Sequence, residues 1–158
     1  MSSAVQPAVS ATGSVSIRTV RPDDLEAVIR LDEAITGAAK PAYWAKLFAE
    51  FEAASDPTLS FLVAEMSGRV VGFIAGEVRA VEFGSDACGW VFGLDVEPGL
   101  RVKSVGTKLF DTLCDRFRAA GVSKVRTMLA RDNDLVLAFF RSLGMMAGPF
   151  IQLEKDLD

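Results

Sequence analysis

The stretch LDVEPGLRVKSVGTKL, residues 94–109, joins a strand-like run to an amphipathic helix and decides how the rest of the chain is interpreted. The run 89–96 is rich in aromatic and β-branched residues, as strands are, and a Pro-Gly pair ends it. The helix predicted over 104–120 has apolar residues every four positions, at Val105, Leu109, Leu113 and Phe117. A strand that leads into such a helix is typical of an α/β unit.

The whole chain has the length and composition of one domain. It has 158 residues, of which 50% are hydrophobic and 24% charged, so it can bury a single core. We expect a flexible leader over 1–14 and a single domain over 15–158. No apolar run is long enough to span a membrane and no secretion signal is visible, which favours the cytoplasm and no membrane partner. The net charge of -4 argues against a nucleic-acid partner.

The chain has no histidine, which excludes any mechanism that needs an imidazole base or ligand. Cys88 and Cys114 are too few for a disulfide framework and fit no paired metal-ligand spacing, so we expect no metal site.

Periodicity along the chain predicts an alternation of strands and helices. The expected strands are 15–20, 59–66, 70–79, 89–96, 122–129 and 149–157, and the expected helices are 22–37, 41–54, 104–120 and 132–141. Strands linked by hairpins run antiparallel, whereas a strand–helix–strand crossover runs parallel. The sequence therefore predicts an α/β fold with a mixed, mostly antiparallel sheet flanked by about four helices.

The loop before the third helix has the composition of an anion site. Ser104 and Gly106 are small enough to let a ligand approach the backbone, and the first amides of a helix have no intrahelical acceptor. Arg101 and Lys103 add positive charge. The loop contains neither the GxxxxGK[ST] nor the GxGxxG pattern of nucleotide-binding folds. A basic loop of this kind is also common at an ordinary solvated helix start, and both interpretations stay open on these residues alone.

Two motifs together resemble the GNAT superfamily of acyl-CoA-dependent N-acyltransferases. Val96-x-Pro98 and Arg101-x-x-Ser104-x-Gly106 are similar to its pyrophosphate-binding motif, with Ser104 in the place of the usual first glycine. The stretch NDLVLAFFRSLGM, residues 133–145, is similar to its last motif, with Phe140 where the family often has a tyrosine. The order of elements over 15–157 also resembles that superfamily.

The resemblance implies that acetyl-CoA, or another acyl-CoA, binds where two central parallel strands, 89–96 and 122–129, splay apart. Pantetheine would pair with backbone groups of the first strand, and the pyrophosphate would bind the amides that follow it. The implied cofactor-binding residues are Leu94, Val96, Arg101, Val102, Lys103, Ser104, Val105, Gly106, Thr107, Asn133, Phe139 and Phe140.

The implied reaction is direct attack of a neutral amine on the thioester, which needs a base for the amine and benefits from an acid for the thiolate. Phe140 cannot donate a proton, so water or Tyr43 is left for that role, and Phe140 is a core residue or a wall of the cleft. Glu77 and Asp95 are the candidate bases, although either also fits a solvated strand position. Two further roles stay open. Glu82 and Asp86 are candidates for attracting a cationic amine, and Cys88 or Cys114 is a candidate for forming a covalent acyl-enzyme.

The function expected from these residues is N-acyl transfer from acetyl-CoA to a primary amine, either a small molecule or a protein lysine. The alternative is a CoA-binding regulatory domain of the same fold that has lost catalysis. The high apolar fraction is compatible with a homodimer.

Overall fold

A computed structural model describes residues 13–54, 58–79 and 84–157 of the chain. Its strands are β1 (Val15–Thr19), β2 (Leu59–Met66), β3 (Arg69–Arg79), β4 (Cys88–Val96) and β5 (Val125–Thr127). Its α-helices are α1 (Leu25–Thr36), α2 (Pro41–Ala53), α3 (Val105–Ala119) and α4 (Asp134–Ser142), with short 3-10 helices η1 (Pro22–Asp24) and η3 (Pro98–Lys103).

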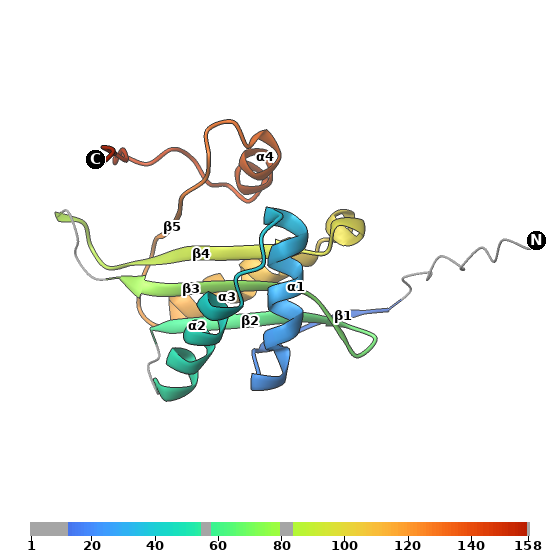
Figure 1. Cartoon of the computed structure of the whole chain (residues 1–158). Helices are drawn as coiled ribbons and strands as arrows, with labels where there is room; N and C mark the ends of the chain where they lie inside the picture. The colour runs from blue at the N-terminus through green and yellow to red at the C-terminus, as the bar shows by residue number, and fades with distance from the viewer. Residues whose placement is uncertain (1–12, 55–57, 80–83, 158) are drawn as a thin grey trace, which may run out of the picture. The chain divides into compact units, whose positions relative to one another are not determined.

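The strands form one sheet in the order β1-β2-β3-β4-β5 (Figure 1). The first three pairings are antiparallel and the β4–β5 pairing is parallel. The β2–β3 hairpin turns at Ser67 and Gly68, with φ of 51° and 76°, the left-handed values that a tight hairpin turn needs. The predicted fold class is confirmed: the described residues form a mostly antiparallel sheet with one parallel pair, and four α-helices.

Helices cover both faces of the sheet in the part of the chain up to Thr127. On one face, Trp44 and Phe48 of α2 pack with Phe61 and Phe73 of the sheet, with Trp44 and Phe73 ring centroids 5.1 Å apart. This face therefore holds an aromatic core under α1 and α2.

The other face is covered by α3, which lies close against glycines of the sheet. A Cβ atom on Gly76 would stand 2.9 Å from Phe117, and one on Gly89 only 2.3 Å from the same ring. Glycine is required at both positions because α3 approaches β3 and β4 so closely.

The last part of the chain, Met128–Asp158, forms a second compact unit that contains α4. The strand predicted over 149–157 is wrong, since no strand is present among these residues up to 157. Leu153 and Leu157 are 85% and 90% exposed, because alternating apolar residues form a strand only when another strand accepts their backbone hydrogen bonds. The strand predicted over 122–129 is shorter than expected, with only β5 formed.

Most of the predicted leader, residues 1–12, lies outside the described residues. None of the helices that the structure describes is both long and apolar enough to cross a membrane.

A buried ion pair anchors the start of α1 to the sheet. Arg18 of β1 donates two hydrogen bonds to Asp24, of 2.7 and 3.0 Å, and a third of 2.9 Å to Glu65 of β2. The Arg21 N–H also donates to Asp24, at 2.7 Å. Burial raises the pKa of the Asp24 carboxyl, but the hydrogen bonds from Arg18 and Arg21 outweigh it, so the pKa lies below its ordinary value.

We expect Asp24→Asn to lower the free energy of unfolding at neutral pH by about 1.5 to 3 kcal/mol, because hydrogen bonds to an ionised group are lost. The folded pKa of Asp24 is below the unfolded value of about 3.9, so its stabilisation is complete above that pH and disappears as the pH falls through the folded pKa. Denaturant unfolding from neutral pH to strong acid measures both effects. Asp23→Asn, on the exposed neighbour, is the control, and an equal loss in both variants would contradict the assignment.

Candidate active site

β4 contains an extra residue at the point where its pairing with β5 ends. Gly93 lies opposite Ala75 and Val91 lies opposite the next residue of β3, Gly76, so Phe92 is a bulge without a partner. The parallel pairing with β5 covers only Gly89–Val91. Beyond Val91, no strand of the described residues pairs with the second edge of β4.

Backbone hydrogen bonds show which groups of β4 point to that open edge. The Gly89 N–H donates to Lys124 on the β5 side, at 2.8 Å, and the Glu97 N–H donates to Val71 of β3, at 2.8 Å. Backbone groups of successive residues point to opposite edges of a strand. Since those of Glu97 point to β3, the backbone groups of Val96 and Leu94, one and three residues earlier, point away from β3. The parallel pair expected from the sequence is thus present, with β5 as the edge strand.

A cavity of about 390 Å³ lies beside this part of β4, within the unit that ends at Thr127. Its walls come from α1, the loop after it, α2 and β4. The lining residues are Asp32, Thr36, Lys40, Tyr43, Trp44, Phe92, Gly93, Leu94 and Asp95.

The most buried charge of this cavity is Asp32 of α1, whose side chain is 5% exposed. Trp44 donates its indole N–H to Asp32 Oδ2 at 2.9 Å, and Lys40 Nζ lies 3.1 Å from the same oxygen and 3.2 Å from Oδ1. Asp32 and Lys40 are site residues that were not predicted from the sequence. The sequence does hold one indication of Asp32. It lies four residues after Val28, so this carboxylate falls on the buried, otherwise apolar face of α1.

The two carboxylates predicted as bases have different surroundings. Asp95 lines the cavity and lies opposite Phe73, on the face of the sheet that α1 and α2 cover. Glu77 instead pairs with Arg79, with Arg79 Nε 2.9 Å from Glu77 Oε1, and it is not among the residues that line the cavity. The structure therefore brings Asp95, and not Glu77, together with Tyr43.

The loop before α3 gives Ser104 an unusual backbone. Arg101, Val102 and Lys103 lie in η3, and Ser104 follows with φ of 61° and ψ of 16°, in the left-handed region. That conformation favours glycine, which explains physically why the resembling motif has glycine here. The Ser104 side chain makes no capping hydrogen bond, and Val105 and Gly106 are buried.

The second unit carries the last predicted residues. The Asn133 side chain caps α4 by accepting a hydrogen bond from the Val136 N–H at 3.2 Å. Phe139 and Phe140 pack edge to face with centroids 5.2 Å apart, and Phe140 is buried. Their predicted contacts with the cofactor stay predictions. Of the remaining candidates, Asp86 is exposed and Glu82 lies outside the described residues.

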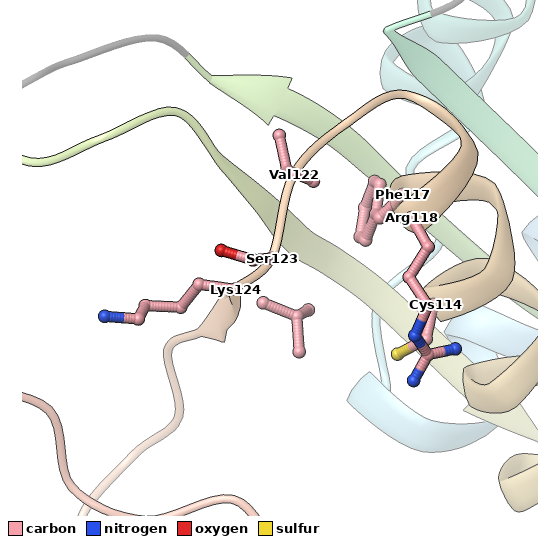
Figure 2. Close-up of a pocket in the computed structure, with 7 residues that line it drawn as sticks. Cys114, Phe117, Arg118, Val122, Ser123 and Lys124 are labelled. Carbon is pink, nitrogen blue, oxygen red and sulfur yellow. The ribbon is translucent and has the colours of Figure 1, made fainter.

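Neither cysteine lines the larger cavity. Cys114 lines a second, small cavity of about 60 Å³ between α3 and the segment that leads into β5, with Phe117, Arg118 and residues 122–125 (Figure 2). Burial raises the pKa of the Cys114 thiol, which makes it a poorer nucleophile. Cys88 is only 2% exposed, and its Sγ lies 3.6 Å from Arg126 Nη1. The structure gives no support to a covalent acyl-enzyme at either thiol.

Comparison with known proteins identifies the family. The model of the acetyltransferase (GNAT) family matches residues 25–145, and the chain belongs to that family. Acetyltransferase ECA0875 of Pectobacterium atrosepticum is 33% identical over 143 residues, which cover 90% of this chain and 96% of the relative. Family membership confirms the predicted enzyme class, an acetyltransferase that uses acetyl-CoA as its cosubstrate.

Solved structures share the fold at low sequence identity. The aminoglycoside N-acetyltransferase AAC(6')-Iy in complex with CoA has a TM-score of 0.80 at 17% identity, over 94% of this chain and 99% of that one. Glucosamine-6-phosphate N-acetyltransferase of Arabidopsis thaliana has a TM-score of 0.71 at 20% identity, over 92% of this chain and 99% of that one.

We expect Ser104→Gly to raise the free energy of unfolding by up to about 1 kcal/mol. Left-handed backbone costs a non-glycine residue about 1 to 2 kcal/mol, and the extra entropy of unfolded glycine offsets about 0.5 to 1 kcal/mol of the gain. Ser104→Val should instead destabilise, since a β-branched residue fits this conformation poorly. Denaturant unfolding of the three proteins measures the series, and a glycine variant less stable than the native protein would contradict it.

Proposed function

We propose that this protein transfers the acetyl group of acetyl-CoA directly to a primary amine, which binds in the cavity between α1, α2 and β4. The observation that carries the proposal is the open edge of β4, which runs from the bulge at Phe92 to Val96 and lies beside a cavity lined by Asp95. The proposed acyltransferase domain spans residues 15–158.

The residues at this edge fit CoA. The backbone groups of Leu94 and Val96 point away from β3, so an extended chain with amide groups, such as pantetheine, can add to the edge as a further strand would. Beyond that edge, the first amides of α3 have no intrahelical acceptor, and Ser104 provides no side-chain cap. A pyrophosphate there would accept from the amides between Val102 and Thr107 and gain from the helix dipole.

When bound, acetyl-CoA supplies an activated acyl carbon and a thiolate that can leave. Asp95 draws the ammonium of the acceptor into the cavity and takes up its proton, directly or through water. The aromatic faces of Tyr43 and Phe92, which are 50% and 37% exposed, favour the same cation. The Thr36 hydroxyl in the cavity wall donates to the Asp32 backbone oxygen at 2.8 Å. Tyr43 is therefore the hydroxyl that we assign to return a proton to the leaving thiolate, since Phe140 has none to donate.

The acceptor is a cationic primary amine in this proposal. A volume of about 390 Å³ holds a small amine or the end of a lysine side chain. Two structural neighbours are named for amino-sugar acceptors, an aminoglycoside and glucosamine 6-phosphate, which supports a small-molecule amine over a protein lysine. A location in the cytoplasm and a homodimer stay predictions.

The test of the function is release of the free CoA thiol when the purified protein is mixed with acetyl-CoA and a panel of small amines and lysine peptides. We expect release with small cationic amines. If acetyl-CoA binds and no amine in the panel releases the thiol, the regulatory alternative is favoured instead.

Acetyl-CoA binding can be tested at Ser104 with a matched pair of variants. Asp and Asn both tolerate left-handed backbone, so both variants should fold. We expect Ser104→Asp to weaken binding about tenfold or more, because a carboxylate at the start of α3 repels the pyrophosphate, and Ser104→Asn to bind nearly as the native protein does. Calorimetric titration measures the two affinities, and equal affinities would contradict the loop assignment.

The base can be tested by comparing Asp95→Asn with Glu77→Gln. We expect Asp95→Asn to lower kcat by about 10² to 10⁴, the usual effect of losing a positioned acid or base, and Glu77→Gln to change it far less. The native rate should also rise with pH, since an amine with a pKa near about 10.4 is mostly protonated at neutral pH. Superimposable pH–rate profiles for all three proteins would eliminate both carboxylates.

A further inference from the structure

Lys40 pairs with the buried Asp32 carboxylate in the wall of the cavity. It is the residue that immediately precedes α2, and its side chain is 42% exposed, whereas that of its partner Asp32 is 5% exposed. Lys40 Nζ lies within 3.2 Å of both Asp32 oxygens. The lysine is therefore the solvent-side partner of this pair, and both residues line the cavity in which the acceptor is proposed to bind.

The Asp32 carboxylate needs a cation at this position. It lies next to the aromatic core, where the Trp44 indole donates one hydrogen bond but carries no charge. A buried carboxylate without a compensating cation is strongly disfavoured. Among the described residues that line the cavity, Lys40 is the cationic one.

We propose that Lys40 is a specificity residue: its tethered ammonium occupies a cation subsite at Asp32, so that the native acceptor presents only one ammonium group to the cavity. The inference rests on the proposed function, because it assigns the substrate class of the same site. Asp32 and Asp95 both line the cavity, and Lys40 pairs with Asp32. The acceptor's reacting ammonium then belongs with Asp95.

The tether is what makes Lys40 an effective competitor. An ammonium held on the same chain has an effective concentration in the millimolar range or above at its partner. A free diamine must displace it to place its second ammonium on Asp32, so a diamine gains little over a monoamine in the native protein. Without Lys40, the same second ammonium would meet an uncompensated carboxylate.

The experiment compares butylamine with butanediamine, which carries an ammonium at each end, as acceptors for the native protein and Lys40→Ala. We expect the ratio of kcat/KM for the diamine to that for the monoamine to rise about tenfold or more in Lys40→Ala, the worth of one hydrogen-bonded ion pair. Lys40→Arg should keep the native ratio. Lys46→Ala is the matched control, because Lys46 lies on α2 with its side chain 78% exposed and pairs with Glu50.

A ratio that does not change in Lys40→Ala, while acetyl-CoA binding stays native, overturns the inference. An equal rise in Lys46→Ala overturns it as well, since the effect would then be one of general surface charge. In the double variant Asp32→Asn/Lys40→Ala, the ratio of kcat/KM for the diamine to that for the monoamine should return to the native value. A double variant that keeps the raised ratio shows that Asp32 is not the subsite. If Lys40→Ala does not fold, Lys40→Met, which keeps the apolar stem, replaces it.

A binding measurement that needs no catalysis distinguishes failure of the proposed function from failure of the inference about Lys40. If no protein turns over either amine, the thermal unfolding midpoint is measured with each amine present. The inference expects butanediamine to raise the midpoint of Lys40→Ala more than butylamine does, and expects no such difference for the native protein or Lys46→Ala. The absence of that difference overturns the inference independently of acetyl transfer.

Discussion

The candidate site depends on one extra residue in β4, the bulge at Phe92. Val91 lies opposite Gly76, on the face that α3 covers, whereas Asp95 lies opposite Phe73, on the face of α1 and α2. Val91 and Asp95 are four residues apart, so in a regular strand both side chains would lie on the same face. The bulge moves Asp95 out of the core under α3 and into the cavity. It also turns the backbone groups of Leu94 and Val96 to the edge that β5 leaves open.

The walls opposite the bulge are fixed by the aromatic core. Trp44 packs on Phe73 of the sheet and on Tyr43 in the cavity wall, and its indole N–H holds Asp32. One side chain thus joins the packing of α2 to the position of a buried charge in α1. Because protein cores are close-packed, the Asp32 carboxylate has little freedom to move. The cavity therefore presents a charge that is already in place before any ligand binds.

Local patterns were enough to predict most elements, since α1 and α3 bury one face each, and the two strands of the β2–β3 hairpin are apolar runs on either side of a short turn at Ser67 and Gly68. The bulge at Phe92 left no such signal, because aromatic, small and apolar residues fit either face of the segment 90–94. The Asp32–Lys40 pair was missed for a related reason: the partners lie on different elements, and only the fold brings them together. The strand predicted over 149–157 failed in the opposite way, since its pattern was clear but no partner strand pairs with it.

The charge balance of the cavity bears on catalysis as well as on specificity. In the proposed mechanism the acceptor binds as an ammonium but reacts as a neutral amine, and carboxylates favour the first step while opposing the second. If Asp32 had no cation beside it, its charge would hold the ammonium more firmly and raise the pKa of the bound amine. Lys40 cancels the charge of Asp32, so the bound amine loses its proton more readily. The absence of a hydroxyl at position 140 matters less, since a thiolate whose conjugate acid has a pKa near about 8.5 can leave without a strong acid.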